Sequence, residues 1–95
     1  MKYKDLYLLE EGDLLLLNDN IKLKTTHNNN EVIKKNRKDY GNFAIPAKFI
    51  SYTLNNKCKI KICKKFKNIL KLNDEILVES DLVREVTEKG FNYYL

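Results

Sequence analysis

Short runs of apolar residues alternate with polar turn residues along most of the chain. Asn, Asp, Gly and Pro residues mark these turns, at positions 11–13, 18–20, 27–30, 39–42, 46, 55–56 and 73–74. Turn signals this frequent favour short β-strands. The four leucines Leu14 to Leu17 predict a strand that is buried on both faces.

Alternation of apolar and polar residues marks further strands. Residues 21–25 place Lys22 and Lys24 between apolar positions, and this strand is predicted to form a hairpin with residues 14–17. Residues 57–63 show the clearest period of two. Shorter strands are expected at residues 32–33, 43–45 and 75–78.

The period changes after residue 80. Three apolar residues between positions 82 and 86 suit one face of a short helix, which Ser80 or Asp81 is expected to cap. Gly90 is the expected end of that helix.

A weak internal similarity links two parts of the chain. Tyr3–Leu6 followed by Gly12–Leu17 resembles Phe66–Ile69 followed by Asn73–Val78, with a gap of two residues. Two interpretations stay open: a structural repeat, or convergence on the same turn chemistry.

The length of 95 residues predicts a single domain over residues 1–95, with one modest core that buries roughly 60 to 70% of the unfolded chain's surface. The net charge of +5 comes almost entirely from 16 lysines, with Arg37 and Arg84 as the only arginines. Arginine is the side chain suited to bidentate contact with phosphate or guanine, so this composition disfavours specific base reading.

Catalytic and metal-binding signatures are not found. His27 is the only histidine, and Cys58 and Cys63 lack the CxxC spacing of a zinc site. On one strand these cysteines would lie roughly 16 Å apart on opposite faces, too far apart to form a disulfide. We therefore expect a protein that is not an enzyme and uses no cofactor or metal.

The strongest charge feature is a lysine-rich block. Residues 57–71 carry seven lysines and no acid, whereas residues 72–95 carry six acids against Arg84 and Lys89. The lysines could protect an exposed sheet edge, meet an acidic protein partner, or follow a nucleic-acid backbone. The candidate anion or nucleic-acid contacts are Lys57, Lys59, Lys61, Lys64, Lys65 and Lys67.

Residues 6 to 52 resemble an SH3-type small β-barrel. The acidic turn and apolar strand at residues 10–15, followed by Gly41 to Ile50 with its strand, proline and aromatic, carry the similarity. The resemblance implies a partner groove lined by Tyr7, Phe49 and Tyr52, although the groove tryptophan of that family has no counterpart. The segment from Gly41 to Pro46 also resembles the swapped-hairpin barrels of AbrB-like transcription factors.

The expected fold is therefore mainly β: a small antiparallel SH3-like barrel of five to seven strands with a short C-terminal helix. The first functional hypothesis is a non-enzymatic interaction or assembly module, such as a small subunit of a phage or viral particle, with a protein partner or a second copy. The alternatives are an AbrB-like nucleic-acid-binding barrel that uses the lysine strand and, third, an SH3 adaptor for Pro-rich peptides.

Location is predicted from what the chain lacks. No apolar run approaches the ~20 residues that span a bilayer, and the first residues lack the apolar core of a signal peptide. We expect no membrane partner, and a protein that is cytoplasmic when made or is carried in a virion.

Overall fold

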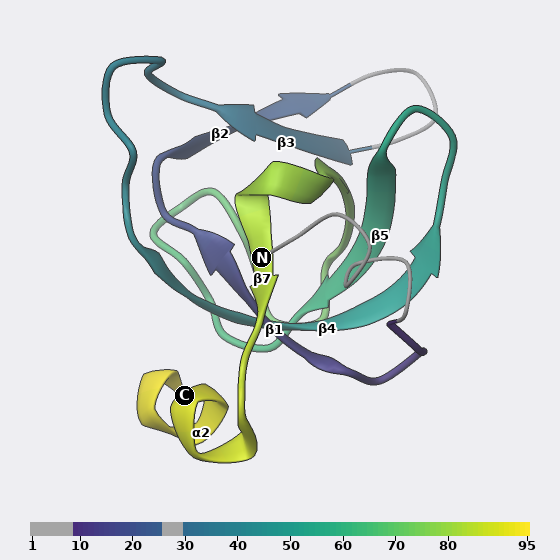
Figure 1. Cartoon of the computed structure of the whole chain (residues 1–95). Coiled ribbons are helices and arrows are strands. Elements are labelled where there is room, and N and C mark those ends of the chain that lie inside the picture. The colour runs from purple at the N-terminus through teal and green to yellow at the C-terminus, as the bar shows by residue number, and fades with distance from the viewer. Residues whose placement is uncertain (1–8, 26–29) are drawn as a thin grey trace.

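The computed structural model describes residues 9–25 and 30–95, which form a curved seven-stranded sheet with a helix at the C-terminus (Figure 1). The strands lie in the order β2-β3-β6-β5-β4-β1-β7. Their bounds are β1 Leu14–Asn18, β2 Ile21–Thr25, β3 Asn30–Lys34, β4 Phe43–Tyr52, β5 Lys57–Ile62, β6 Glu75–Glu79 and β7 Val83–Glu85. A 3-10 turn, η1, covers Ser80–Leu82, and the helix α2 covers Glu88–Tyr94.

The mainly β class, the number of strands and the C-terminal helix are confirmed, and two finer parts of the fold prediction are wrong. β2 and β7 stand at the two ends of the strand order and no ladder joins them, so the barrel is not closed. The sheet is also not purely antiparallel, because β3 and β6 run parallel where Val32 lies beside Val78. A parallel pair needs a long crossover, and here β4 and β5 lie within it.

The strand of four leucines is buried as predicted. Leu15, Leu16 and Leu17 are buried, because β1 pairs with β4 on one side and β7 on the other. The predicted hairpin between this strand and residues 21–25 is wrong, since β2 pairs with β3 instead. Asn18 and Asn20 sit at the junction, where their side chains bind the backbone of the loop after β3 and separate the two strands.

The C-terminal helix lies further along the chain than predicted. Residues 80–82 form η1 and Val83–Glu85 pairs with β1 as β7. Of the apolar residues predicted to form a helix face, Leu82 therefore lies in η1, Val83 in an edge strand and Val86 just after that strand. Thr87 caps α2, and its Oγ1 accepts a hydrogen bond from Gly90 N at 3.1 Å. Gly90 is therefore inside the helix and does not end it.

A tight turn introduces β1. Asp13 Oδ2 accepts a hydrogen bond from Glu10 N at 2.9 Å, and Asp13 N donates to Glu10 O at 3.0 Å. Gly12, at φ +92°, adopts the left-handed conformation that favours glycine. Its N–H donates to Phe49 O of β4 at 2.8 Å, which ties the turn to the sheet.

The same turn introduces β6. Asp74 Oδ2 accepts from Lys71 N at 2.8 Å, and the left-handed residue is Asn73, at φ +72°. Asn73 N donates to Ile62 O of β5 at 2.8 Å, as Gly12 does to β4. Residues 12–17 and 73–78 therefore share the geometry of the turn that precedes the strand, as both a structural repeat and convergence on the same turn chemistry would give. The Tyr3–Leu6 part of the similarity lies outside the described residues.

Candidate functional site

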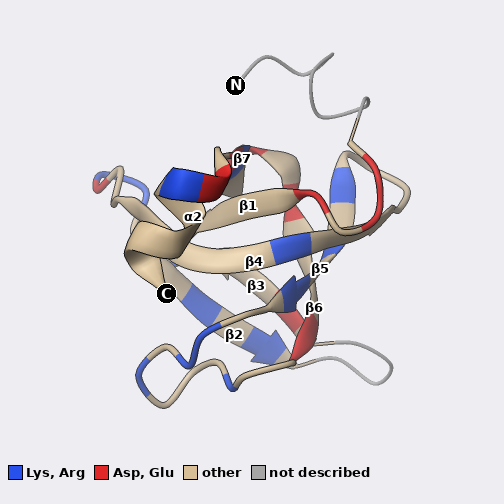
Figure 2. Cartoon of the chain, turned by 90° about the horizontal axis from the view of Figure 1, so that it is seen from below, with Lys and Arg blue, Asp and Glu red and all other residues tan. Residues whose placement is uncertain are grey.

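The lysines of β5 do not lie at a sheet edge. β5 pairs with β4 on one side and β6 on the other, so edge protection is wrong for this strand. Lys57 Nζ lies 2.6 Å from Glu31 Oε1, and Lys59 Nζ lies 3.7 Å from Glu75 Oε1. The hydrogen bond to Glu31 raises the pKa of Lys57, against an opposing effect of burial. Glu31 of β3 and Glu75 of β6 thus pair with these two lysines. Figure 2 colours Lys and Arg blue and Asp and Glu red along the strands.

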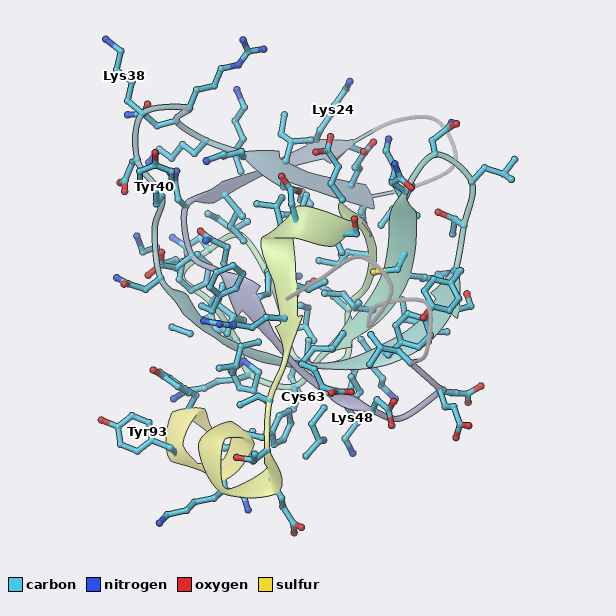
Figure 3. All side chains as sticks on the ribbon, viewed as in Figure 1. Lys24, Lys38, Tyr40, Lys48, Cys63 and Tyr93 are labelled. Atoms are coloured by element: carbon cyan, nitrogen blue, oxygen red, sulfur yellow. The ribbon has the colours of Figure 1, made fainter. Side chains whose placement is uncertain are left out.

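Lys61, the third lysine of β5, lies directly opposite Lys48 of β4. Neither ammonium forms an ion pair within the described part of the chain. Like charges opposite each other on neighbouring strands repel, so an anion bound between them would be stabilising. Both lysines act on Cys63: burial raises the pKa of its thiol, and their positive charge partly offsets that rise. Figure 3 labels Cys63 and Lys48.

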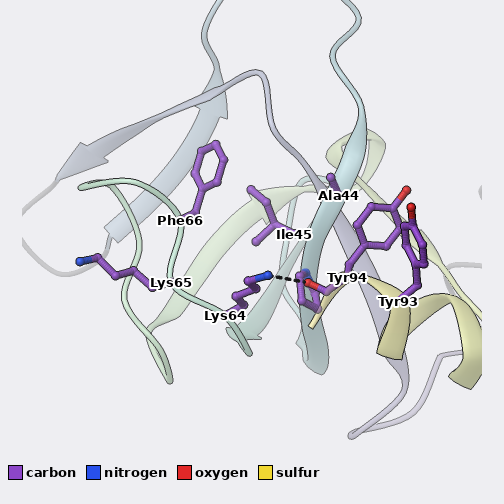
Figure 4. A pocket seen from close by; sticks show the side chains of 8 residues that line it. Ala44, Ile45, Lys64, Lys65, Phe66, Tyr93 and Tyr94 are labelled. Atoms are coloured by element: carbon purple, nitrogen blue, oxygen red, sulfur yellow. Dashed lines mark hydrogen bonds between the residues drawn. The ribbon is translucent and has the colours of Figure 1, made fainter.

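A hollow of about 270 Å³ lies between α2, the start of β4 and the loop that follows β5 (Figure 4). We call it the α2 hollow; it is lined by Ala44, Ile45, Pro46, Lys64, Lys65, Phe66, Tyr93 and Tyr94. The β4 residues are apolar, and the other walls carry only aromatic rings and lysines. An uncharged ring or an anionic group would fit these walls better than a cation.

α2 brings its tyrosines to this hollow from the end of the chain. Phe91 is buried and anchors the helix, which leaves Tyr93 80% exposed. The rings of Tyr93 and Tyr94 meet edge to face, with centroids 4.9 Å apart. Lys64 Nζ donates a hydrogen bond to Tyr94 O at 3.2 Å (Figure 4) and so ties the loop after β5 to the helix.

The loop after β5 holds Phe66 at the surface. Phe66 N donates to Leu70 O at 2.9 Å and Leu70 N donates back to Phe66 O at 3.1 Å. Leu70 is buried in the core and fixes this small turn. The Phe66 ring is half-buried, and Lys67 Nζ lies 5.2 Å from its centroid. An aromatic ring with a cation beside it is thereby held at the molecular surface.

A second hollow, of about 400 Å³, is also lined by Phe66. We call it the Asn20 hollow; it is lined by Asp19, Asn20, Lys35, Asn36, Asp39, Phe66 and Lys67. Unlike the α2 hollow it carries carboxylates and amides. Because Phe66 lines both hollows, they lie next to each other.

The proposed partner groove is not formed by its three aromatic residues. Phe49 is only 3% exposed and packs in the core, with its ring centroid 4.7 Å from that of Tyr52. The Tyr52 hydroxyl accepts a hydrogen bond from Leu9 N at 2.9 Å. Tyr7 lies outside the described residues. Phe49 is therefore a core residue whose ring is not accessible to a peptide.

Both cysteines are free thiols. Cys58 is buried, and burial raises the pKa of its thiol to about 11, so it stays neutral at physiological pH. Within residues 9–25 and 30–95, His, Cys, Asp and Glu form no group of three or more that could hold a metal ion. Over the same residues, no helix is long and apolar enough to cross a membrane. His27 lies outside the described residues.

Of the six predicted lysines, Lys64, Lys65 and Lys67 line the two hollows. Sequence reasoning missed the partners of these lysines, namely Tyr93, Tyr94 and the loop at residues 35–39. The basic run Lys34, Lys35, Arg37 and Lys38 and the C-terminal Tyr-Tyr pair were the available signals. Neither signal shows which other segment it meets.

Comparisons with protein-family models, with characterised proteins and with solved structures gave no match for this chain.

Proposed function

We propose that the protein is a non-enzymatic module that binds single-stranded nucleic acid across the α2 hollow. Lys48, Lys61 and Lys65 contact phosphates, and Phe66 and Tyr93 provide faces on which bases stack. This assignment keeps Lys61 of the lysine strand, which the AbrB-like hypothesis favoured, and adds Lys48 of β4 and Lys65 of the loop that follows β5.

The observation that carries the proposal is the composition of the α2 hollow. Three aromatic side chains and two lysines surround it without a single acid. Proteins that hold single strands combine a positively charged path with aromatic rings, and each stacked base contributes about 1–3 kcal/mol. The lysine block itself contains one such ring, Phe66, and α2 adds Tyr93 and Tyr94.

Single strands fit this surface better than a duplex. Stacking on Phe66 or Tyr93 requires bases that are not already stacked in a helix. The volume of about 270 Å³ is slightly below the range of drug-sized pockets, which begins at about 300 Å³, and suits one base. Direct reading of a duplex groove would favour arginine, and of the two arginines only Arg84 is near an aromatic ring, that of Phe43.

The test is fluorescence anisotropy with labelled mixed-sequence 12-nucleotide DNA and RNA over a range of salt. Binding should weaken with a log–log slope of about −0.7 per phosphate contact. Lys61→Gln with Lys65→Gln should flatten the slope by about 1.4. Lys64 is left unchanged because it also holds Tyr94 O. Lys22→Gln with Lys24→Gln, on exposed positions of β2, removes the same charge and should leave the slope unaltered.

A separate variant tests the contribution of aromatic stacking to binding. Tyr93→Ala should weaken binding by about 5- to 150-fold, the equivalent of one stacked base, with no change in salt slope. The high exposure of Tyr93 makes this substitution safe for folding. A parent protein that binds no oligonucleotide at low salt, or variants that match the β2 control, would reject the proposal.

The second candidate is the interaction or assembly module, with a protein partner or another copy of the chain, as in a phage or viral particle. Exposed leucines favour it: Leu54 is 86% exposed and Leu72 is 59% exposed. Failure of oligonucleotide binding together with concentration-dependent self-association in analytical ultracentrifugation would transfer support to this candidate.

A further inference from the structure

The Asn20 hollow lies next to the stacking surface but has a different chemistry. It shares Phe66 with the α2 hollow, so a strand that stacks on this ring would bring its next base there. The volume of about 400 Å³ accommodates one base. Lys35 and Lys67 line the same hollow and can meet the adjoining phosphates.

Two carboxylates in this hollow are fixed by the backbone. Asp19 Oδ1 accepts a hydrogen bond from Asn42 N at 2.8 Å, and Asp39 Oδ1 accepts from Gly41 N at 2.9 Å. No hydrogen bond within the described residues uses the second oxygen of either carboxylate. Each aspartate therefore offers one free acceptor.

Asn20 makes the wall that holds these groups rigid. Its buried carboxamide donates through Nδ2 to both Asn36 O and Asp39 O. Its backbone carbonyl accepts from Lys35 N at 3.0 Å. The loop at residues 35–39 is thus tied to the start of β2, which pre-organises the hollow before a ligand arrives.

We propose that the Asn20 hollow receives the neighbouring base of the bound strand and selects bases that carry an exocyclic amino group. This inference rests on the proposed function. Ionised carboxylates accept hydrogen bonds and donate none. Cytosine presents its N4 amino group to such acceptors, whereas thymine and uracil present the O4 carbonyl in its place. A carboxylate facing that carbonyl would be desolvated without a donor, which is costly.

Cytosine and thymine oligonucleotides provide the sharpest comparison, because both are pyrimidines with similar stacking. We expect dC12 to bind about tenfold more tightly than dT12 in fluorescence anisotropy, at the low end of the discrimination of a good base contact. Taking the ratio of the two affinities removes uniform electrostatic effects, which change both alike.

Asp39→Asn and Asp19→Asn test the assigned groups. Asparagine keeps the Oδ1 acceptor for the backbone N–H and turns the free oxygen into an amide donor. Each variant should reduce the preference for dC12 severalfold, and the double variant should bring it within about twofold of unity. Asp81→Asn, an equal change of charge at an exposed position on η1, should leave the ratio at its parent value.

The outcomes separate this inference from the proposed function. Equal affinity for dC12 and dT12, or a preference that both aspartate variants retain, would overturn the inference while binding itself stands. No binding of either oligonucleotide would remove the proposed function as well. Should the variants fail to fold, the parent decides: adding dC12 should shift the amide NMR signals of Gly41 and Asn42, and unshifted signals in a saturated complex would refute the inference.

Discussion

At the scale of single residues, Gly41 shows how an absent side chain shapes the wall of the Asn20 hollow. Its backbone is left-handed, at φ +65°. A Cβ atom there would overlap Asn18 Oδ1, and it would lie 2.7 Å from Asn20 Cβ and 2.9 Å from Asp19 Oδ1. Those side chains come from the end of β1 and the turn after it, so only glycine lets the two loops approach this closely.

Gly41→Ala should therefore destabilise the protein more than Gly12→Ala. Gly12 is also left-handed, but a Cβ atom added there would meet no other atom within 4 Å, so its substitution costs about 1 kcal/mol of backbone strain. Gly41→Ala adds overpacking, for a total of about 2–4 kcal/mol. Urea denaturation of both variants measures the difference. Equal losses would show that the contact with Asn18 relaxes freely.

At the scale of elements, the two matching turns account for how β1 and β6 enter the sheet. In each turn, an aspartate side chain accepts a hydrogen bond from the backbone N–H three residues earlier. A left-handed residue donates its N–H to the strand that lies beside the one being introduced: Gly12 to β4 and Asn73 to β5. β4 and β5, which receive these turns, also pair with each other. The four central strands are thus organised as two similar turn-and-strand units on either side of the β4–β5 pair.

Asp13→Ala and Asp74→Ala should cost similar amounts, about 0.5–1.5 kcal/mol each, because each removes one hydrogen bond. The losses should add in the double variant, since the turns share no partner. Chemical denaturation provides the measurement. Asp→Asn at either site keeps an acceptor oxygen and should recover most of the loss; an asparagine variant as unstable as the alanine variant would contradict the assigned role.

At the scale of the whole molecule, the β2–β3 hairpin is the least supported part of the sheet. It joins the rest through a parallel ladder that pairs only Glu31 with Leu77 and Val32 with Val78. β2 forms one end of the sheet, and four of its five residues are exposed. By contrast β4, β5 and β1 each have a partner strand on both sides.

Native-state hydrogen exchange should reflect this difference. We expect the amides of β2 and β3 to exchange at a lower opening free energy than those of β4 and β5, because local stability follows buried contacts and paired backbone. Two-dimensional NMR after transfer to D₂O measures each amide separately. Protection of β2 equal to that of β5 would mean that the hairpin opens only with global unfolding.

The positions of the strands were easier to predict from the sequence than the pairing between strands. The period of two in β5 and the leucine run of β1 are local patterns, and both strands form where these patterns occur. The prediction of a helix face at residues 82–86 was wrong, because a short apolar run suits a helix face and a strand equally well. Their pairing with β1 at Leu15 and Leu17 decided between the two.

The features of the candidate site also fall into those that local sequence determines and those that depend on tertiary contacts. The sequence by itself determined the short strands, the turn chemistry at Asp13 and Asp74, and an acid-free lysine block, because all three depend on residues close together in the chain. Tertiary structure alone decided that β5 is an interior strand with Lys57 and Lys59 paired to glutamates. It also brought Phe66 into one hollow with Tyr93 and into another with the loop at residues 35–39. Contacts between segments that are distant in the sequence depend on strand order and on which buried side chains anchor each loop. No local sequence pattern indicates either.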